Sequence, residues 1–223
     1  MRVRERKIPV GEGEVSALWL RPREAVAVLA LAHGAGAGMH HAFMEALAEV
    51  LAHSAIATLR YQFPYMETGR SFPDRPPRLI ATVQAAVAHA RQLARGLPIV
   101  AGGKSMGGRM TSQAAAAEGL PVGGLMFFGF PLHPPKKPGV ERAAHLDSVT
   151  LPMLFLQGTR DTLADLELLT PVCRSLGRRA TLHTVAEADH GFGVLKRSGR
   201  EAEDVMAELA TTSRRWLERH VLA

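Results

Sequence analysis

Residues 103–107 (GKSMG) have the G-x-S-x-G spacing that sets a serine on a sharp turn between a strand and a helix. The surroundings fit, because an apolar run at 97–101 precedes the turn and an Ala-rich run at 109–118 follows it. Such a turn would raise the Ser105 hydroxyl above the sheet and aim the Met106 N–H at a developing oxyanion. The pattern therefore predicts a nucleophilic serine. A plain strand-to-helix turn is the alternative, since glycine is common in turns.

Two acid–base partners for Ser105 follow it in the chain. A serine hydroxyl is a weak nucleophile at neutral pH, so it needs a base to take its proton and an acid to orient that base. Asp161 comes just after an apolar run at 151–156, and His190 comes just after a short predicted strand at 181–185. Open α/β sheets place their chemistry in this loop layer beyond the strand ends. We therefore predict that Ser105, His190 and Asp161 act together.

Two other carboxylates, and a structural role for Asp161 itself, are alternatives. Asp161 could cap a helix that begins near Leu163, because aspartate is a favoured N-cap residue. Asp189 adjoins His190 and would diverge from it in an extended segment, while Asp165 should lie one turn into the helix and point along it. Asp161 is therefore the preferred partner of the histidine.

A glycine-rich loop could supply the second oxyanion donor. It reads HGAGAG at 33–38 and follows an unbroken apolar run at 26–32, which is typical of a strand buried on both faces. Glycines let the backbone approach a ligand closely, so we expect the Ala35 N–H to be the donor and His33 to brace the loop. A phosphate cradle is the weaker alternative, because no Gly-Lys-Ser/Thr end follows and the spacing is not G-x-G-x-x-G.

Together these motifs resemble the α/β-hydrolases of the small, lidless kind, similar in size to the dienelactone hydrolases. Three segments resemble the group that includes testis-expressed protein thirty and the third subunit of the nonspecific-lethal histone acetyltransferase complex: HGAG at 33–36, RYQFPY at 60–65 and GGKSMGGR at 102–109. The resemblance spans nearly the whole chain. It implies an α/β-hydrolase fold with a Ser-His-Asp site and leaves the substrate open, because fold analogy does not fix function.

Length and composition bound the architecture. A chain of 223 residues, 47% hydrophobic and 22% charged, is typical of one globular domain, here residues 1–223. Predicted strands and helices alternate, which favours a mostly parallel sheet with helices on both faces. An antiparallel pair near 3–8 and 15–20 should lead into it. The stretch 131–149 is too short for a cap domain, so we expect an open, shallow pocket.

Helical stripes and the single cysteine indicate the core and the compartment. Cys173 lies in a helical pattern and is expected in the core; as the only cysteine it excludes an internal disulfide and fits a reducing compartment. The charged start and the lack of a long apolar run predict a cytoplasmic protein with no membrane partner. Three apolar stripes recur at helical spacing: Phe43, Leu47, Val50 and Leu51; Leu79, Val83, Val87 and Ala90; Val205, Leu209 and Trp216.

The net charge of +6 raises the question of a polyanionic partner. The basic residues are dispersed and lack interleaved aromatic residues, so we expect no nucleic-acid partner. Lys104, Lys136 and Lys137 could ring the pocket mouth and favour an acidic substrate. Alternatively, Lys104 could pair with Glu67 or Asp74 and only brace a loop.

The predicted function is a serine hydrolase of small carboxylic esters or thioesters, acting through an acyl-enzyme without a metal or cofactor. Lys104 and Tyr61 are expected to contact the substrate. A catalytically weak interaction or scaffold protein with the same fold is the alternative, and the intact Ser-His-Asp set argues against it. The sequence predicts neither the acyl and leaving groups nor the oligomeric state.

Overall fold

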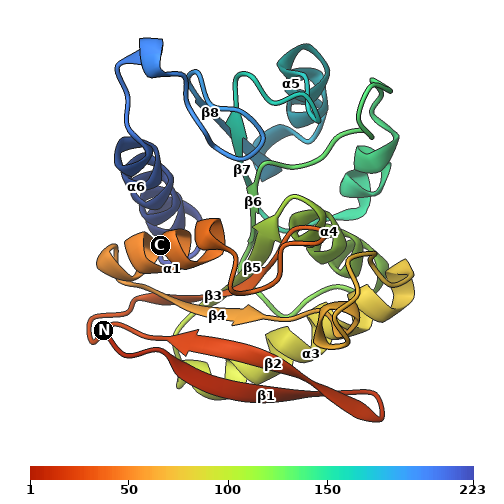
Figure 1. Cartoon of the computed structure of the whole chain (residues 1–223), viewed down its shortest axis with the longest axis vertical. Helices are drawn as coiled ribbons and strands as arrows, with labels where there is room; N and C mark the ends of the chain where they lie inside the picture. The colour runs from red at the N-terminus through yellow and green to blue at the C-terminus, as the bar shows by residue number, and fades with distance from the viewer.

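The computed structural model describes residues 1–223, and its centre is one eight-stranded sheet (Figure 1). The strand order is β1-β2-β4-β3-β5-β6-β7-β8. β2 pairs antiparallel with both β1 and β4, and every other pairing is parallel. The strands are β1 (Arg4–Val10), β2 (Gly13–Leu20), β3 (Ala27–Ala32), β4 (Ile56–Tyr61), β5 (Ile99–Lys104), β6 (Leu125–Phe128), β7 (Met153–Gly158) and β8 (Ala180–Val185).

Helices cover both faces of this sheet. α1 and α6 pack on one face, side by side in Figure 1, and α3, α4 and α5 pack on the other. The doubly covered, mostly parallel sheet predicted from the alternation of elements is therefore confirmed. The helices are α1 (Ala42–His53), α2 (Pro64–Glu67), α3 (Pro76–Ala94), α4 (Met106–Glu118), α5 (Leu166–Ser175) and α6 (Ala202–His220), with 3₁₀ segments η1 (Glu141–Ser148), η2 (Gly177–Arg179) and η3 (Lys196–Ser198).

Strand β3 illustrates how a continuous apolar run becomes a central strand. Val28 and Ala30 face the core beneath α3, α4 and α5, whereas Leu29 and Leu31 face the core beneath α1 and α6. All six β3 residues are buried. Because side chains alternate along a strand, both faces must be apolar, and each buried leucine stabilises the fold by about 2 kcal/mol.

The predicted helical stripes and the lead-in hairpin are also present. All four stripe residues of α3 are buried, as are the three of α6. In α1 the stripe is less complete, because Phe43 and Val50 are only half-buried, and Phe43 leans toward the loop after β8. Burial of Cys173 in the core raises the pKa of its thiol to about 12, which makes it a poor nucleophile.

Strand β5 and helix α4 meet at a single residue, Ser105, and both extend closer to it than their sequences suggest. α4 begins at Met106 rather than near residue 109. Gly107 and Gly108 obscured that start, since glycine disfavours helices. The structure needs glycine there, because a Cβ on Gly107 would lie 2.5 Å from the His33 carbonyl oxygen.

The stretch 131–149 is short and forms no cap domain. Its helical part, η1, packs against α4 through buried Ala143 and Leu146. A hydrogen bond of 2.7 Å between Ser112 Oγ and His145 Nε2 joins the two elements. Ser105 stays partly exposed as a result. Among the helices, none has the length and apolar character needed to cross a bilayer.

Candidate active site

Ser105 occupies a strained turn between β5 and α4. Its backbone has φ 50° and ψ −116°, a conformation that costs a non-glycine residue about 1–3 kcal/mol. Neighbouring backbone leaves no room for side chains around it: a Cβ on Gly103 would lie 2.4 Å from the Ala32 carbonyl oxygen. This turn places Ser105 at the carboxyl edge of the sheet, where the loops after β3, β7 and β8 also meet.

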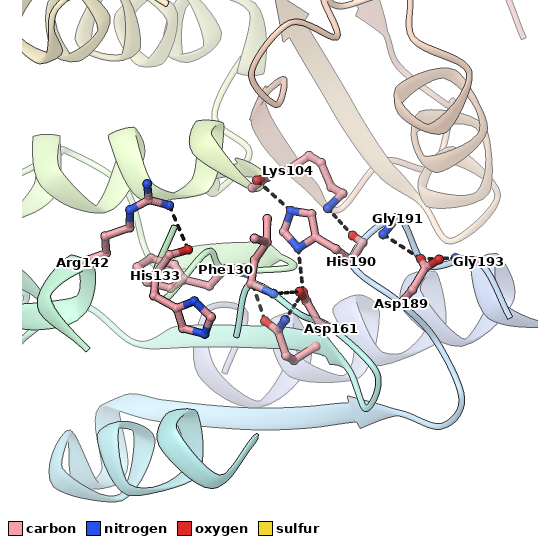
Figure 2. Close-up of polar contacts among 12 residues, drawn as sticks. Lys104, Phe130, His133, Arg142, Asp161, Asp189, His190, Gly191 and Gly193 are labelled. Carbon is pink, nitrogen blue, oxygen red and sulfur yellow. Dashed lines mark hydrogen bonds and ion pairs between the residues drawn. The ribbon is translucent and has the colours of Figure 1, made fainter. Parts of the chain in front are cut away.

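The loop after β8 carries His190, and the side chain of Asp189 in the same loop stabilises its turn. Asp189 Oδ1 accepts hydrogen bonds from the N–H groups of Gly191 at 2.8 Å and Gly193 at 2.9 Å, as Figure 2 shows. Within this tight turn Phe192 adopts a φ of 66°, unusual for a bulky residue. Asp189 is thus engaged by its own loop and does not reach the imidazole of His190.

A continuous hydrogen-bond chain links Ser105, His190 and Asp161. His190 Nε2 lies 2.8 Å from Ser105 Oγ, and His190 Nδ1 lies 2.6 Å from Asp161 Oδ2 (Figure 2). An ionised carboxylate only accepts, so Nδ1 carries the proton and Nε2 is free to accept from the serine hydroxyl. The proton is therefore on the nitrogen where it must be for His190 to act as a general base on Ser105.

The buried carboxylate of Asp161 is held by two further donors. Its side chain is 0% exposed, Leu163 N–H donates to Oδ1 at 2.8 Å, and the side-chain amide of Gln157 donates to Oδ2. Gln157 in turn accepts from the N–H of Phe130 at 2.9 Å. Sequence reasoning missed Gln157, although its position as the polar residue at the end of an apolar strand was a signal.

The sequence offered Asp161 as an alternative N-cap and placed Asp165 inside the helix, and the structure differs on both points. The helix begins at Leu166 rather than near Leu163, and Asp165 is its N-cap, accepting from Glu167 N–H at 2.9 Å. The expectation that Asp165 lies one turn into the helix was therefore wrong. Asp161 lies outside that helix.

The acid loop and the histidine loop are joined to each other by hydrogen bonds. Arg160 N–H donates to the Ala188 carbonyl at 2.9 Å, and Glu187 N–H donates to Thr159 Oγ1 at 2.9 Å. These contacts fix the spacing between Asp161 and His190 independently of their side chains.

The glycine-rich loop after β3 approaches Ser105 closely. A Cβ on Gly34 would lie 3.7 Å from Ser105 Cβ, so Ala35 follows at a point beside the serine. Neither Ala35 N–H nor Met106 N–H has an acceptor within the chain. The first N–H groups of a helix lack intrahelical acceptors, and here that includes Met106.

His33 is a structural brace, in keeping with expectation. Its Nδ1 lies 2.7 Å from the Gly34 carbonyl and its Nε2 accepts from Phe63 N–H at 3.1 Å. Burial lowers the pKa of His33 to about 4, so the ring is neutral and both nitrogens keep these roles at physiological pH. The loop gains a second contact where Gly36 N–H donates to the Tyr65 hydroxyl at 3.1 Å.

Comparisons with known proteins agree with this arrangement. A family model described as an alpha/beta hydrolase domain matches residues 25–218. The chain belongs to the α/β-hydrolase family. A lidless α/β serine hydrolase from Xanthomonas campestris has a TM-score of 0.77 at 19% identity, covering 97% of this chain and 95% of its own. Dienelactone hydrolase from Anabaena variabilis has 0.74 at 20%, covering 98% of each chain. The esterase domain of a Rhodothermus marinus protein has 0.74 at 16%, covering 99% and 100%.

Within this α/β-hydrolase domain, Lys104 contacts the histidine loop rather than either carboxylate considered as its partner. Its ammonium donates to the backbone carbonyl of His190, as Figure 2 shows. The alternative of pairing with Glu67 or Asp74 was wrong, because Glu67 accepts from Ser16 and Asp74 pairs with arginines. The amine that was expected to meet substrate is already engaged by the histidine loop.

Tyr61 is a core residue, so its expected substrate contact was wrong. It is 1% exposed, and its ring packs edge-on against Phe63 with centroids 5.6 Å apart. Burial raises the pKa of its hydroxyl. Tyr61 ends β4, and side chains alternate along a strand; this one faces the helix layer, not the loop edge.

The loop after β6 is tied to η1 and to the loop after β7. Arg142 of η1 donates to the His133 carbonyl at 3.1 Å, which ties this loop to η1 (Figure 2). Backbone N–H groups of Leu132 and His133 both donate to the Leu163 carbonyl, at 2.8 Å and 3.2 Å. No group of three or more His, Cys, Asp or Glu side chains is placed to hold a metal ion.

Proposed function

We propose that this chain is a serine hydrolase that cleaves small carboxylic esters or thioesters through an acyl-enzyme. The observation that carries the proposal is the unbroken hydrogen-bond chain from Ser105 Oγ through the His190 ring to Asp161 Oδ2. A serine whose proton already points at a carboxylate-oriented imidazole is poised for nucleophilic catalysis. The family membership supports the reaction class without naming a substrate.

In the acylation step Ser105 Oγ forms a bond to the substrate carbonyl carbon while its proton passes to His190 Nε2. Asp161 stabilises the resulting imidazolium through Nδ1–H. The imidazolium then gives its proton to the departing alkoxide or thiolate, which leaves an acyl-serine. Water attacks that ester with His190 again as base, and collapse of the second tetrahedral intermediate releases the acid and restores Ser105.

Ala35 and Met106 supply the backbone N–H groups that bind the oxyanion in this scheme. Both N–H groups lack an acceptor within the chain, which supports the assignment. Preorganised donors of this kind each contribute roughly 3–4 kcal/mol to transition-state stabilisation. Met106 also opens α4, so the positive end of the helix dipole adds to the attraction for the developing charge.

The substrate class follows from the open setting of Ser105. No cap domain covers the serine, because η1 packs against α4 instead. A small acyl group therefore fits better than a long chain, whose methylenes would remain in water. Solved relatives described as a dienelactone hydrolase and an esterase domain support ester chemistry.

We also propose a single domain, a cytoplasmic location and no nucleic-acid partner. The free Cys173 supports the cytoplasmic location, and the dispersed charge supports the absence of a nucleic-acid partner.

An active-site phosphonate tests this proposal. A fluorophosphonate should add its mass to the peptide that holds Ser105, and Ser105→Ala should abolish the labelling. Correctly folded wild-type protein that resists labelling would contradict hydrolase activity and favour an interaction protein of the same fold. The proposed grouping with testis-expressed protein thirty bears on that outcome, since the sequence resemblance implies no particular substrate.

A further inference from the structure

The side chain of Lys104 crosses from the end of β5 to the backbone of the histidine loop. Its ammonium donates to the carbonyl oxygen of His190. The nitrogen also lies 5.8 Å from the ring centroid of Phe43 and 5.5 Å from that of Phe192. These two rings stack on each other with centroids 5.6 Å apart, so α1 and the histidine loop are joined around the cation.

Space for this crossing depends on Gly129, the first residue after β6. A Cβ at Gly129 would lie 2.9 Å from Lys104 Nζ and 3.4 Å from the His190 carbonyl oxygen. Its φ of 71° also favours glycine. One packed cluster therefore contains Lys104, which precedes Ser105; Gly129, which follows β6; and Phe192, which lies two residues after His190.

The cation is held there without an ion-pair partner. None of the ion pairs in the chain includes Lys104. Burial lowers the pKa of Lys104 to about 8, and the more distant carboxylates of Asp161 and Asp189 offset only part of that effect. A half-buried charge in this position lowers the stability of the fold compared with an apolar side chain of similar size. Stability alone therefore does not account for a lysine here.

We propose that Lys104 is a positioning residue that holds His190 in register with Ser105. The inference rests on the proposed hydrolase function. Adjacent residues of the turn contact two ends of the same histidine: Lys104 holds its backbone carbonyl, and Ser105 contacts its ring nitrogen. Two such attachments fix the location and the tilt of the imidazole. Misplacing a reacting group by about 1 Å lowers rates by about 10².

Replacing Lys104 with methionine separates this role from substrate binding and from stability. We expect Lys104→Met to lower kcat on p-nitrophenyl acetate by about 10² while KM changes by less than about threefold. The midpoint of denaturant unfolding should stay equal or rise. Lys7→Met, which removes an exposed lysine from β1 at the opposite edge of the sheet from β8, is the matched control and should match the wild type.

The pH profile supplies a second readout. The titratable groups near Lys104 are Asp161, Asp189 and His190, while α1 and the loop after β6 present only Phe43 and Gly129. Loss of the Lys104 proton above about pH 8 weakens the clamp, so wild-type kcat should fall on the alkaline side. That fall should be absent in Lys104→Met, and Phe43→Leu should move it to lower pH by removing one ring from the cation.

Three results would overturn the clamp: wild-type kcat in Lys104→Met, a rise in KM with kcat unchanged, or activity lost only in proportion to stability. Failure of the hydrolase proposal would look different, because wild-type protein would then resist the phosphonate. An NMR measurement tests positioning even if the protein has no activity, because the low-field Nδ1–H proton of His190 should be present in the wild type and in Lys7→Met. In Lys104→Met it should exchange with water faster; an unchanged signal would contradict positioning.

Discussion

Helix α4 and the turn before it carry two serine–histidine pairs of nearly equal length. Ser105 Oγ lies 2.8 Å from His190 Nε2, and Ser112 Oγ lies 2.7 Å from His145 Nε2. Distance does not distinguish a candidate nucleophile from a structural hydroxyl here. The two pairs differ in the direction of the proton.

The Ser112 hydroxyl has already committed its proton. It donates to the Arg109 carbonyl one turn back at 2.9 Å, so it can only accept from His145 Nε2–H. Ser105 has the opposite polarity, because the carboxylate on Nδ1 forces Nε2 to accept. No carboxylate contacts His145; burial and the nearby Arg109 charge lower its pKa to about 4. A reactive serine therefore requires an oriented base as well as a nearby one.

Serine-to-alanine changes give the largest expected contrast. Ser105→Ala should lower kcat by about 10⁶, the scale seen when the nucleophile of a serine-protease triad is removed. Ser112→Ala should leave kcat near wild type and lower the unfolding free energy by about 1–3 kcal/mol, because His145 loses its partner. Ester hydrolysis and urea denaturation of both variants measure this. Equal loss of activity in the two would remove the distinction.

Carboxylate changes test what orients the base. Asp161→Asn should lower kcat by about 10⁴, because an amide facing Nδ1 stabilises the wrong tautomer. Asp189→Asn should act mainly through the loop, with a loss nearer tenfold, since Asp189 binds only backbone N–H groups. Steady-state kinetics of both proteins give the comparison. A silent Asp161→Asn beside a damaging Asp189→Asn would reverse the assignment.

Acyl-chain length tests the exposure that separates Ser105 from buried Ser112. Each methylene buried in a pocket is worth about 0.8 kcal/mol, about fourfold in rate. With no cap over Ser105, longer chains gain little of this, so kcat/KM on p-nitrophenyl esters should peak at short acyl groups. A steady rise toward long chains would reveal an apolar wall around Ser105.

The smallest effect concerns stability in acid. The pKa of His145 falls from 6.5 to about 4 on folding, so between those values the unfolded chain binds a proton that the folded chain does not. Stability is full above pH 6.5 and declines as pH falls toward 4. His145→Gln should reduce the loss between pH 7 and pH 4.5 by about 1 kcal/mol, allowing for partial exposure. Denaturant unfolding at both pH values measures it; an unchanged loss would contradict the assignment.

The sequence predicted the sheet, its helices and the meeting of Ser105, His190 and Asp161, because those depend on local patterns and chain order. Elbow, acid loop and histidine loop each follow a recognisable strand, and parallel strands bring their carboxyl ends together. The same reasoning located the glycine-rich loop beside the serine.

Local patterns and chain order do not predict which way a side chain points or which group it hydrogen-bonds. Tyr61 was misassigned because a strand-end position does not reveal which face its side chain takes. The hydrogen-bond partner of Lys104 was not predicted, because it is a backbone carbonyl and every residue has one. The role of Asp189 as an acceptor for the N–H groups of its own loop was likewise recognisable only in the structure.

The site is assembled from distant parts of the chain, and that has a consequence for biosynthesis. Ser105 and His190 are 85 residues apart, and the histidine follows β8, the last strand and one edge of the sheet. A ribosome that has released the turn and its helix has not yet released the base. Contacts between such distant residues form late in folding, because loop closure must come first. The nascent chain therefore holds Ser105 without its histidine partner until the C-terminal quarter docks and completes the sheet.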